Sequence, residues 1–371
     1  MMRINFVTDF FRDIANFFRS GSVLGIDIGT SAIKAVEVFK KGDALRLQNY
    51  AILETKSYLE RQNRVIQTSS LKISENDGAY LLGALLREMK PSAGIAVASL
   101  PAFASFITVL EMPLLSKTET DRAVAFQARQ FIPIDVQQVY IEWFRIEEFQ
   151  DEGGNKSQRI MLLGIPKDII ARYKSVFKAA KIKIAAFEIE SLALVRSLAP
   201  RADGAPTLIV DIGAYATNII VSEGDIMRFG GETDYGGVHL SHALSRGLGV
   251  SVFRAEELKR RRGLIGSGGE IELSTSMLPF LDVIIQEVRH VKASYERRYG
   301  KVPGQAIFAG GGSNLLGLEK YIERELGVKA VFPPKLSGLS YIPEIEPISG
   351  PLTRSLGVAI GLAKKYFSDV A

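Results

Sequence analysis

The stretches VLGIDIGTSAIKAVEV (23–38) and TLIVDIGAYATNIIV (207–221) share one pattern: an apolar strand, Asp-Ile-Gly, a small-residue turn and a second strand. They lie about 180 residues apart, and a repeat at that spacing indicates two related domains in one chain. Strand patterns and helical patterns occur in both halves of the 371 residues. The sequence therefore predicts an α/β protein with two lobes.

Each repeated turn places a carboxylate at the end of a strand, Asp27 in the first and Asp211 in the second. The glycine that follows lets a ligand approach the backbone, and the small residues after it offer N–H and hydroxyl donors to phosphate. Paired carboxylates suit a hydrated Mg²⁺ between phosphates, because Mg²⁺ prefers oxygen ligands and keeps waters. Lys34, on the strand after the first turn, could neutralise phosphate charge. The alternative is two duplicated hairpins with no ligand.

A third turn, Gly310-Gly311-Gly312-Ser313, follows an apolar strand and precedes a helical segment. Glycines at such a point allow the backbone to lie close to a nucleotide. One Asp-x-Gly turn is common in hairpins, so the prediction of a phosphate site depends on the two repeated turns together with this third turn.

Composition excludes several classes of site. The chain has no Cys and three His, which removes disulfides, thiolate catalysis and Cys-ligated metal centres. Its net charge of +5 is mild, and the one dense basic run, residues 259–262, is read as the solvated end of a helix stopped by Gly263, so we expect no nucleic-acid partner. The longest apolar stretch, 95–110, is too short to cross a membrane and contains Pro101.

The N-terminal segment 1–22 has the pattern of an amphipathic helix. Its apolar residues fall on one helical stripe and are Val7, Phe10, Phe11, Ile14 and Phe18. Three roles fit this pattern: a helix docked on its own domain, an interfacial membrane helix, or a helix that docks on a partner. The opposite face mixes acids and bases instead of being basic, which favours docking on protein.

The three glycine turns resemble the phosphate-1, phosphate-2 and adenosine motifs of the actin-like ATPase superfamily. Within it, the chain resembles the PilM family of cytoplasmic actin-like proteins of type IV pilus assembly, which is itself similar to the cell-division protein FtsA. The resemblance extends from about residue 23 to the C-terminus. It is carried by LGIDIGTSAIKAVEV, AFQARQFIPIDVQQVYIEWFRI, MLLGIPKDIIARYKSVFKAAKIKIAAFEIESLALVRS, VDIGAYATNIIVSEGD and RAEELKRRRG.

The resemblance implies a bilobed actin-like ATPase fold, with duplicated ribonuclease-H-like domains and an inserted subdomain of the FtsA type. The expected division is an N-terminal extension (1–22), a first lobe (23–91, 166–205 and 340–371), the insertion (92–165) and a second lobe (206–339).

The resemblance also implies ATP or ADP with Mg²⁺ as the bound group. Asp27 and Asp211 would hold the metal through water. The phosphates would be contacted by Gly29, Thr30, Ser31 and Lys34 from one side and by Gly213, Thr217 and Asn218 from the other. Ribose and adenine would meet Glu256, Lys259 and the turn Gly310, Gly311, Gly312 and Ser313.

Glu190 resembles the acid that orients water in related ATPases. The alternative is a first-turn acid that favours the helix dipole. Two features depart from the family pattern: Glu188 stands where Asp is frequent, and the aromatic N-terminal segment is longer than the Lys-rich start of the family. The second departure puts the role of residues 1–20 in doubt, and leaves the nucleotide site unaffected.

By resemblance, the expected function is that of a cytoplasmic adaptor, peripheral on the inner membrane and at most a weak ATPase. The groove between the insertion and the first lobe would take the N-terminal tail of a PilN-like membrane protein, with Phe103, Phe106, Trp143 and Phe144 as candidate groove residues. Nucleotide would adjust these contacts. Other pilus platform proteins, the motor ATPase and self-association are further expectations. The alternatives are an FtsA-like filament former and a small-molecule kinase of the superfamily.

Overall fold

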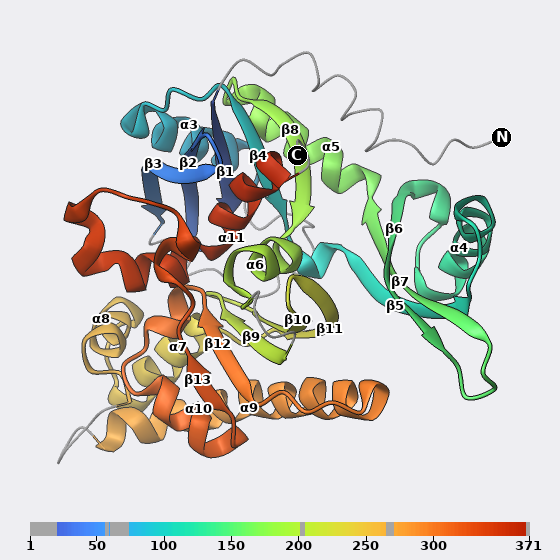
Figure 1. Cartoon of the computed structure of the whole chain (residues 1–371). Coiled ribbons are helices and arrows are strands. Elements are labelled where there is room, and N and C mark those ends of the chain that lie inside the picture. The colour runs from blue at the N-terminus through green and yellow to red at the C-terminus, as the bar shows by residue number, and fades with distance from the viewer. Residues whose placement is uncertain (1–20, 56–58, 60–73, 201–204, 265–270, 369–371) are drawn as a thin grey trace.

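The computed structural model describes residues 21–55, 59, 74–200, 205–264 and 271–368 (Figure 1). The predicted N-terminal helix lies outside these residues. The described part of the chain forms two five-stranded sheets, a three-stranded sheet and the helices that cover them.

The first sheet has the strand order β3-β2-β1-β4-β8. β1 and β2 are antiparallel neighbours, while β4 is parallel to β1 and β8 is parallel to β4. Apolar residues fill β1 because it is buried on both faces. The bounds are β1 Ser22–Ile28, β2 Ala32–Lys41, β3 Ala44–Glu54, β4 Ile95–Leu100 and β8 Lys183–Ile189.

The second sheet repeats this arrangement in the order β11-β10-β9-β12-β13. β9 and β10 are antiparallel, and β12 and β13 continue in parallel with β9. The predicted duplication of an α/β lobe is therefore confirmed. The bounds are β9 Pro206–Ile212, β10 Thr217–Glu223, β11 Ile226–Thr233, β12 Gln305–Ala309 and β13 Lys329–Val331.

The repeated turns also have the same geometry. The N–H of Gly29 donates to the carbonyl of Ala32 at 2.9 Å, and the N–H of Gly213 donates to the carbonyl of Ala216 at 2.9 Å. A Cβ atom on either glycine would lie 2.8 Å from that carbonyl oxygen. Each turn therefore requires glycine for the same steric reason.

Helices α6 (Glu190–Leu198) and α11 (Ser349–Ser368) pack against each other and share one apolar cluster with strands of both lobes. Figure 1 shows these two helices in the centre of the molecule, between the sheets. Within the described ranges, the other α-helices of the two lobes are α3 Glu75–Met89 and α5 Lys167–Ala179 on the first lobe and α7 Gly237–Leu248, α8 Val252–Arg262, α9 Ile271–Tyr299 and α10 Leu318–Leu326 on the second.

A smaller sheet, of order β5-β7-β6, is inserted between β4 and α5 and carries α4 (Lys117–Phe131). Its strands are β5 Phe106–Pro113, β6 Val139–Gln150 and β7 Lys156–Pro166. The expected insertion begins at residue 92, but β4 pairs with β1 and β8 and so belongs to the first sheet. An apolar, fully buried strand fits the centre of a parallel sheet, which places the start of the insertion after β4.

None of the helices in the described ranges combines the length and apolarity that crossing a bilayer requires.

Candidate functional site

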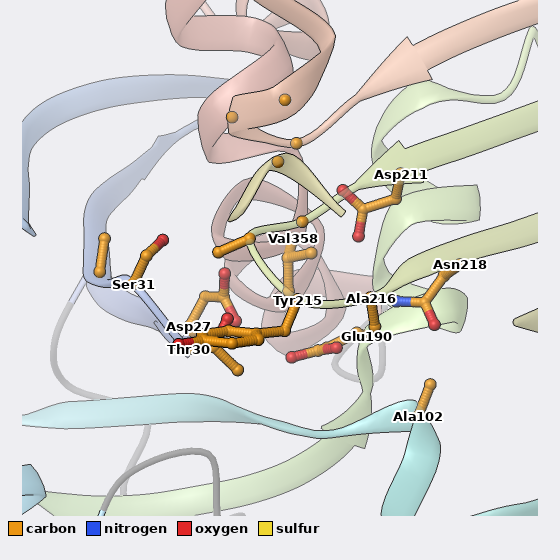
Figure 2. A pocket seen from close by; sticks show the side chains of 18 of the residues that line it. Asp27, Thr30, Ser31, Ala102, Glu190, Asp211, Tyr215, Ala216, Asn218 and Val358 are labelled. Carbon is orange, nitrogen blue, oxygen red and sulfur yellow. The ribbon is translucent and has the colours of Figure 1, made fainter. Parts of the chain in front are cut away.

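A cavity of about 880 Å³ lies between the two lobes. Both Asp-Ile-Gly turns border it, together with the glycine turn at 310–312 and the first residue of α6. Figure 2 shows Asp27 and Asp211 on two sides of this pocket, with the carboxyl group of Glu190 pointing into it. The strand order explains the meeting, because β1 and β9 are the corresponding strands of the two sheets.

All but two of the predicted site residues line this cavity. The lining residues are Asp27, Gly29, Thr30, Ser31, Lys34, Glu190, Asp211, Gly213, Asn218, Glu256, Lys259, Gly310, Gly311 and Gly312. Thr217 and Ser313 are buried elsewhere. The Thr217 hydroxyl donates to the carbonyl of Tyr235 at 2.7 Å, and the Ser313 hydroxyl donates to the carbonyl of Gly310 at 2.8 Å. These two side chains therefore hold the turns in shape.

Asp27 is held by neighbours on two strands. The Ser99 hydroxyl of β4 donates to Asp27 Oδ1 at 2.9 Å, and the Ser99 oxygen in turn accepts the N–H of Ile28 at 3.2 Å. Lys34 lies opposite Asp27 in the β1–β2 ladder, with Nζ 3.7 Å from Asp27 Oδ2. The cavity-facing carboxylate is thus fixed in position with a cation beside it.

Asp211 is packed against the third glycine turn. A Cβ atom on Gly310 would lie 2.5 Å from Asp211 Oδ1 and 2.4 Å from the carbonyl oxygen of Ile212. Gly310 also has a φ of +80°, which disfavours any other residue. Gly310 therefore packs tightly against the end of β9 and lines one wall of the cavity, and the predicted approach of a nucleotide to this turn stays a prediction.

A buried ion pair on α8 forms another part of the wall. The N-cap hydroxyl of Ser251 begins this helix by accepting the N–H of Arg254 at 3.3 Å. Lys259 Nζ lies 2.6 Å from Glu256 Oε2 and donates to the carbonyl of Gly237 at 2.8 Å. Burial opposes ionisation of Glu256, but the charge of Lys259 and its hydrogen bond outweigh burial and hold the pKa of Glu256 at about 2.

Glu190 and Glu188 have different surroundings, although they are two residues apart. Glu190 is 3% exposed and faces the cavity from the start of α6. Glu188 instead accepts hydrogen bonds from Arg196 and lies 3.5 Å from Lys365. The departure from the family pattern at Glu188 therefore lies in an ion cluster on α6 and α11 and outside the cavity lining.

Tyr215, Arg260 and Glu54 are among the cavity residues that sequence reasoning missed. Tyr215 projects from the second turn into the pocket (Figure 2), where it packs with Leu59 and Val238. Arg260 lines the cavity and reaches Glu54, at the end of β3, at 3.2 Å. A contact between residues 206 positions apart leaves no signal in one sequence, whereas the position of Tyr215 inside the repeated turn was visible.

The four aromatic residues expected at the partner groove are divided between sites. Phe103 and Phe106 line the cavity between the lobes. Trp143 packs beneath α4 and donates from its indole N–H to Asp121 Oδ1 at 2.8 Å, so it is part of the core of the insertion. Phe144 is 38% exposed.

The model of the family "Type IV pilus assembly protein PilM" matches residues 25–367. The chain belongs to the PilM family. Among curated proteins, this PilM-family chain is 21% identical to the cell division protein FtsA of Streptococcus pneumoniae serotype 2 (strain D39 / NCTC 7466) over 401 residues, covering 93% of the chain and 84% of FtsA.

Solved structures of several other proteins share the fold. The PilM–PilN type IV pilus biogenesis complex has a chain similar to this one with a TM-score of 0.78 and 22% identity, covering 92% of this chain and 98% of that one. The ethanolamine utilization protein EutJ of Carboxydothermus hydrogenoformans is similar with a TM-score of 0.54 and 16% identity, covering 91% of this chain and 88% of that one. MreB5 of Spiroplasma citri bound to AMPPNP is similar with a TM-score of 0.50 and 11% identity, covering 94% of this chain and 96% of that one. The predicted bilobed actin-like ATPase fold is confirmed.

Proposed function

We propose that this chain is an ATP-binding adaptor of the type IV pilus inner-membrane platform, in which nucleotide between the lobes adjusts the contact with a membrane partner. The observation that carries the nucleotide site is the meeting of both Asp-Ile-Gly turns and the 310–312 turn around one cavity. Its volume of about 880 Å³ is within the range of small-molecule sites.

The residues present fit a hydrated Mg²⁺. Asp27 and Asp211 face the cavity from the two lobes, and carboxylate oxygens are the ligands that Mg²⁺ prefers. No group of three or more metal-binding side chains gathers in the described ranges. Water and phosphate oxygens would therefore complete the coordination, as is usual for Mg²⁺. The bound ion would offset the charge of the phosphates.

Different residues would contact different parts of the nucleotide. Lys34 would counter phosphate charge beside Asp27, and Glu256 with Lys259 would meet the ribose and adenine. Both Glu256 and Lys259 are held by further hydrogen bonds, so little side-chain freedom would be lost when nucleotide binds. Glu190, aimed into the pocket from α6, would orient a water near the terminal phosphate.

The partner we propose is the N-terminal tail of a PilN-like membrane protein. The PilM-family chain of the solved complex is assembled with PilN. In this chain β5 and β6 are the two edge strands of the inserted sheet, and an edge strand can accept an extended peptide by adding a strand. Burial raises the pKa of Glu142 on β6. The positive charge of the nearby Lys365 on α11 opposes this rise. Charged side chains of β6 and α11 therefore lie close together where the peptide would bind.

Calorimetric titration with Mg-ATP and with Mg-ADP tests the nucleotide site. Asp27→Asn and Asp211→Asn should each weaken binding at least tenfold, because each removes a charge that faces the metal. Asp225→Asn, at the exposed hairpin turn between β10 and β11, is the matched control and should bind like the parent. Unchanged affinity in both cavity variants would contradict the site.

Titration with a synthetic peptide of the PilN N-terminal tail tests the partner in the same samples. We expect binding whose affinity differs between the ATP-loaded and nucleotide-free protein. A peptide that does not bind while Mg-ATP binds well would favour the FtsA-like alternative. Sedimentation with Mg-ATP then decides, because a filament former pellets and an adaptor stays in the supernatant.

A further inference from the structure

The inserted sheet is bound by side chains of the second lobe. Arg228 of β11, only 9% exposed, donates to the carbonyl of Ile146 at 3.1 Å and to Glu147 at 3.3 Å, both on β6. Arg298 near the end of α9 donates to the carbonyl of Val109 at 2.9 Å and to Glu111 at 3.2 Å, both on β5. Two strands of the insertion are thus held by two elements of the other lobe.

A third arginine closes the network from the side of the insertion. Arg159 of β7 pairs with Glu147 at 2.8 Å and with Glu111 at 3.0 Å, and its guanidinium lies 4.9 Å from the ring centre of Tyr299 on α9. The hydroxyl of Tyr299 donates to the carbonyl of Arg228 at 3.1 Å. Arginines and glutamates therefore alternate across the contact, and networks of this kind are worth more than isolated surface pairs.

Apolar packing joins the same two parts. Met161 of β7 and Met227 of β11 belong to one buried cluster. The chain itself connects the insertion to the first lobe at two points, after β4 and before α5. Figure 1 shows the inserted sheet on the side of the second lobe where β11 and α9 lie.

Strand β11 also reaches the nucleotide cavity. Glu232 lines the cavity and pairs with Asn218, which lies opposite Asp211 in the next ladder. Arg228 lies four residues earlier on the same strand, about 13 Å away at the usual rise of a strand. One short, hydrogen-bonded strand therefore carries a wall of the cavity at one end and the insertion at the other.

We propose that Arg228 and Arg298 couple the inserted sheet to the second lobe, so that closure of the lobes on nucleotide moves the insertion relative to the first lobe. This inference rests on the proposed function and specifies its regulation. The groove between insertion and first lobe changes width when nucleotide binds, and by linkage a peptide in that groove changes nucleotide affinity by the same factor. Motion of this kind is a hinge or shear closure.

Hydrogen–deuterium exchange of the full chain, with and without Mg-ATP, tests the coupling. In the parent, Mg-ATP should protect the two turns (residues 27–32 and 211–218) and also change exchange in the insertion (106–166). In Arg228→Gln/Arg298→Gln the turns should stay protected while most of the change in the insertion is lost. Arg298→Gln alone, at the more exposed end of the network, keeps the test available if the double variant does not fold.

Arg297→Gln is the matched control, because Arg297 is the neighbour on α9 and donates to Ser294 within the helix. It should respond like the parent. Protected turns with an unresponsive insertion in the parent would overturn the coupling and leave the nucleotide site standing. An insertion that still responds fully in the arginine variants would also overturn it. Turns without protection in the parent would contradict both the site and the coupling.

Discussion

The buried pair on α8 decides how one wall of the cavity depends on pH. Burial opposes ionisation of Glu256, but Lys259 holds its pKa at about 2, below the ordinary 4.5, so its stabilisation is present above pH 4.5 and is lost as pH falls toward 2. Glu256→Gln should lower the free energy of unfolding by about 3 kcal/mol at pH 7, because Lys259 stays buried without its counter-charge. Urea titrations between pH 7 and pH 3 measure this.

The difference in unfolding free energy between the parent and Glu256→Gln should shrink below pH 4.5, because Glu256 then takes up a proton in the unfolded chain while it stays ionised in the folded parent. Glu257→Gln is the control, since Glu257 lies at the surface and pairs with Arg254 and Arg261 on its own helix. It should unfold like the parent at pH 7. If the difference in unfolding free energy between the parent and Glu256→Gln stayed constant down to pH 3, Glu256 would not be the group that carries the charge.

The two glycines that flank β12 offer a comparison. Gly310→Ala should weaken Mg-ATP binding at least tenfold, because its Cβ would displace Asp211 Oδ1 and the carbonyl of Ile212, and its φ of +80° adds strain of about 1–3 kcal/mol. Gly304→Ala, just before β12 and outside the cavity lining, places a Cβ in open space and should bind like the parent. Calorimetry with Mg-ATP measures both. Equal affinities in the two variants would refute the requirement.

At the residue scale, most of the site residues chosen from the sequence line the cavity, but the sequence did not show which side chains hold the turns in shape. The pattern Asp-Ile-Gly is visible twice, so Asp27 and Asp211 can be paired from the amino-acid sequence alone. The pattern does not separate Thr217, whose hydroxyl caps a backbone carbonyl, from Asn218 beside it, which lines the cavity. Neighbouring strand residues face opposite sides, and only the register of β10 with β9 decides which one faces the cavity.

At the scale of elements, α11 lies so close to its neighbours that glycine is required. A Cβ on Gly361 would lie 1.9 Å from the carbonyl oxygen of Ala193 in α6. Gly361→Ala should therefore lower the free energy of unfolding by about 2 kcal/mol or more, as overpacking does in cores. Gly350→Ala in the same helix meets no atom within 4 Å and should stay within about 1 kcal/mol of the parent. Similar urea unfolding midpoints for Gly361→Ala and Gly350→Ala would contradict this packing.

Periodicity located the elements well, because helix signals are local. Ser116 with Glu119 forms the capping box that begins α4, and Gly263, with a φ of +59°, ends α8. The boundary of the insertion was misplaced because it depends on pairing: β4 is an apolar strand like those around it, and only its partners β1 and β8 assign it to the first sheet. Strand partners distant in sequence leave no local pattern.

At the scale of the whole molecule, contacts between the lobes could not be predicted from the sequence. The arginines that hold the insertion are separated from their partners by 81 residues or more. Single charges on strands and helices usually indicate a solvated face, so nothing distinguished Arg228 and Arg298 from other surface arginines. Their role follows from the folding of two lobes and an insertion around one cavity.

Arg260 and Glu54 line that cavity from the two lobes and form an ion pair across it. Arg260 also donates to Glu256 at 2.7 Å, so one guanidinium joins the first lobe to the buried pair of the second. The two exposed partners contribute at most about 1 kcal/mol, and Glu54→Gln should therefore speed ATP release up to about fivefold at low salt. The effect should vanish near ~1 M salt, where such charges are screened.

Stopped-flow release of a fluorescent ATP analogue, measured across salt concentration, gives the effect of this ion pair on the release rate directly. Arg261→Gln is the control, because Arg261 is the next residue on α8 and pairs with Glu257 of the same helix, away from the first lobe. Its release rate should equal that of the parent at every salt concentration. A Glu54→Gln rate that is unchanged at low salt would mean that the lobes are held closed by nucleotide and the packing of α6 and α11 alone.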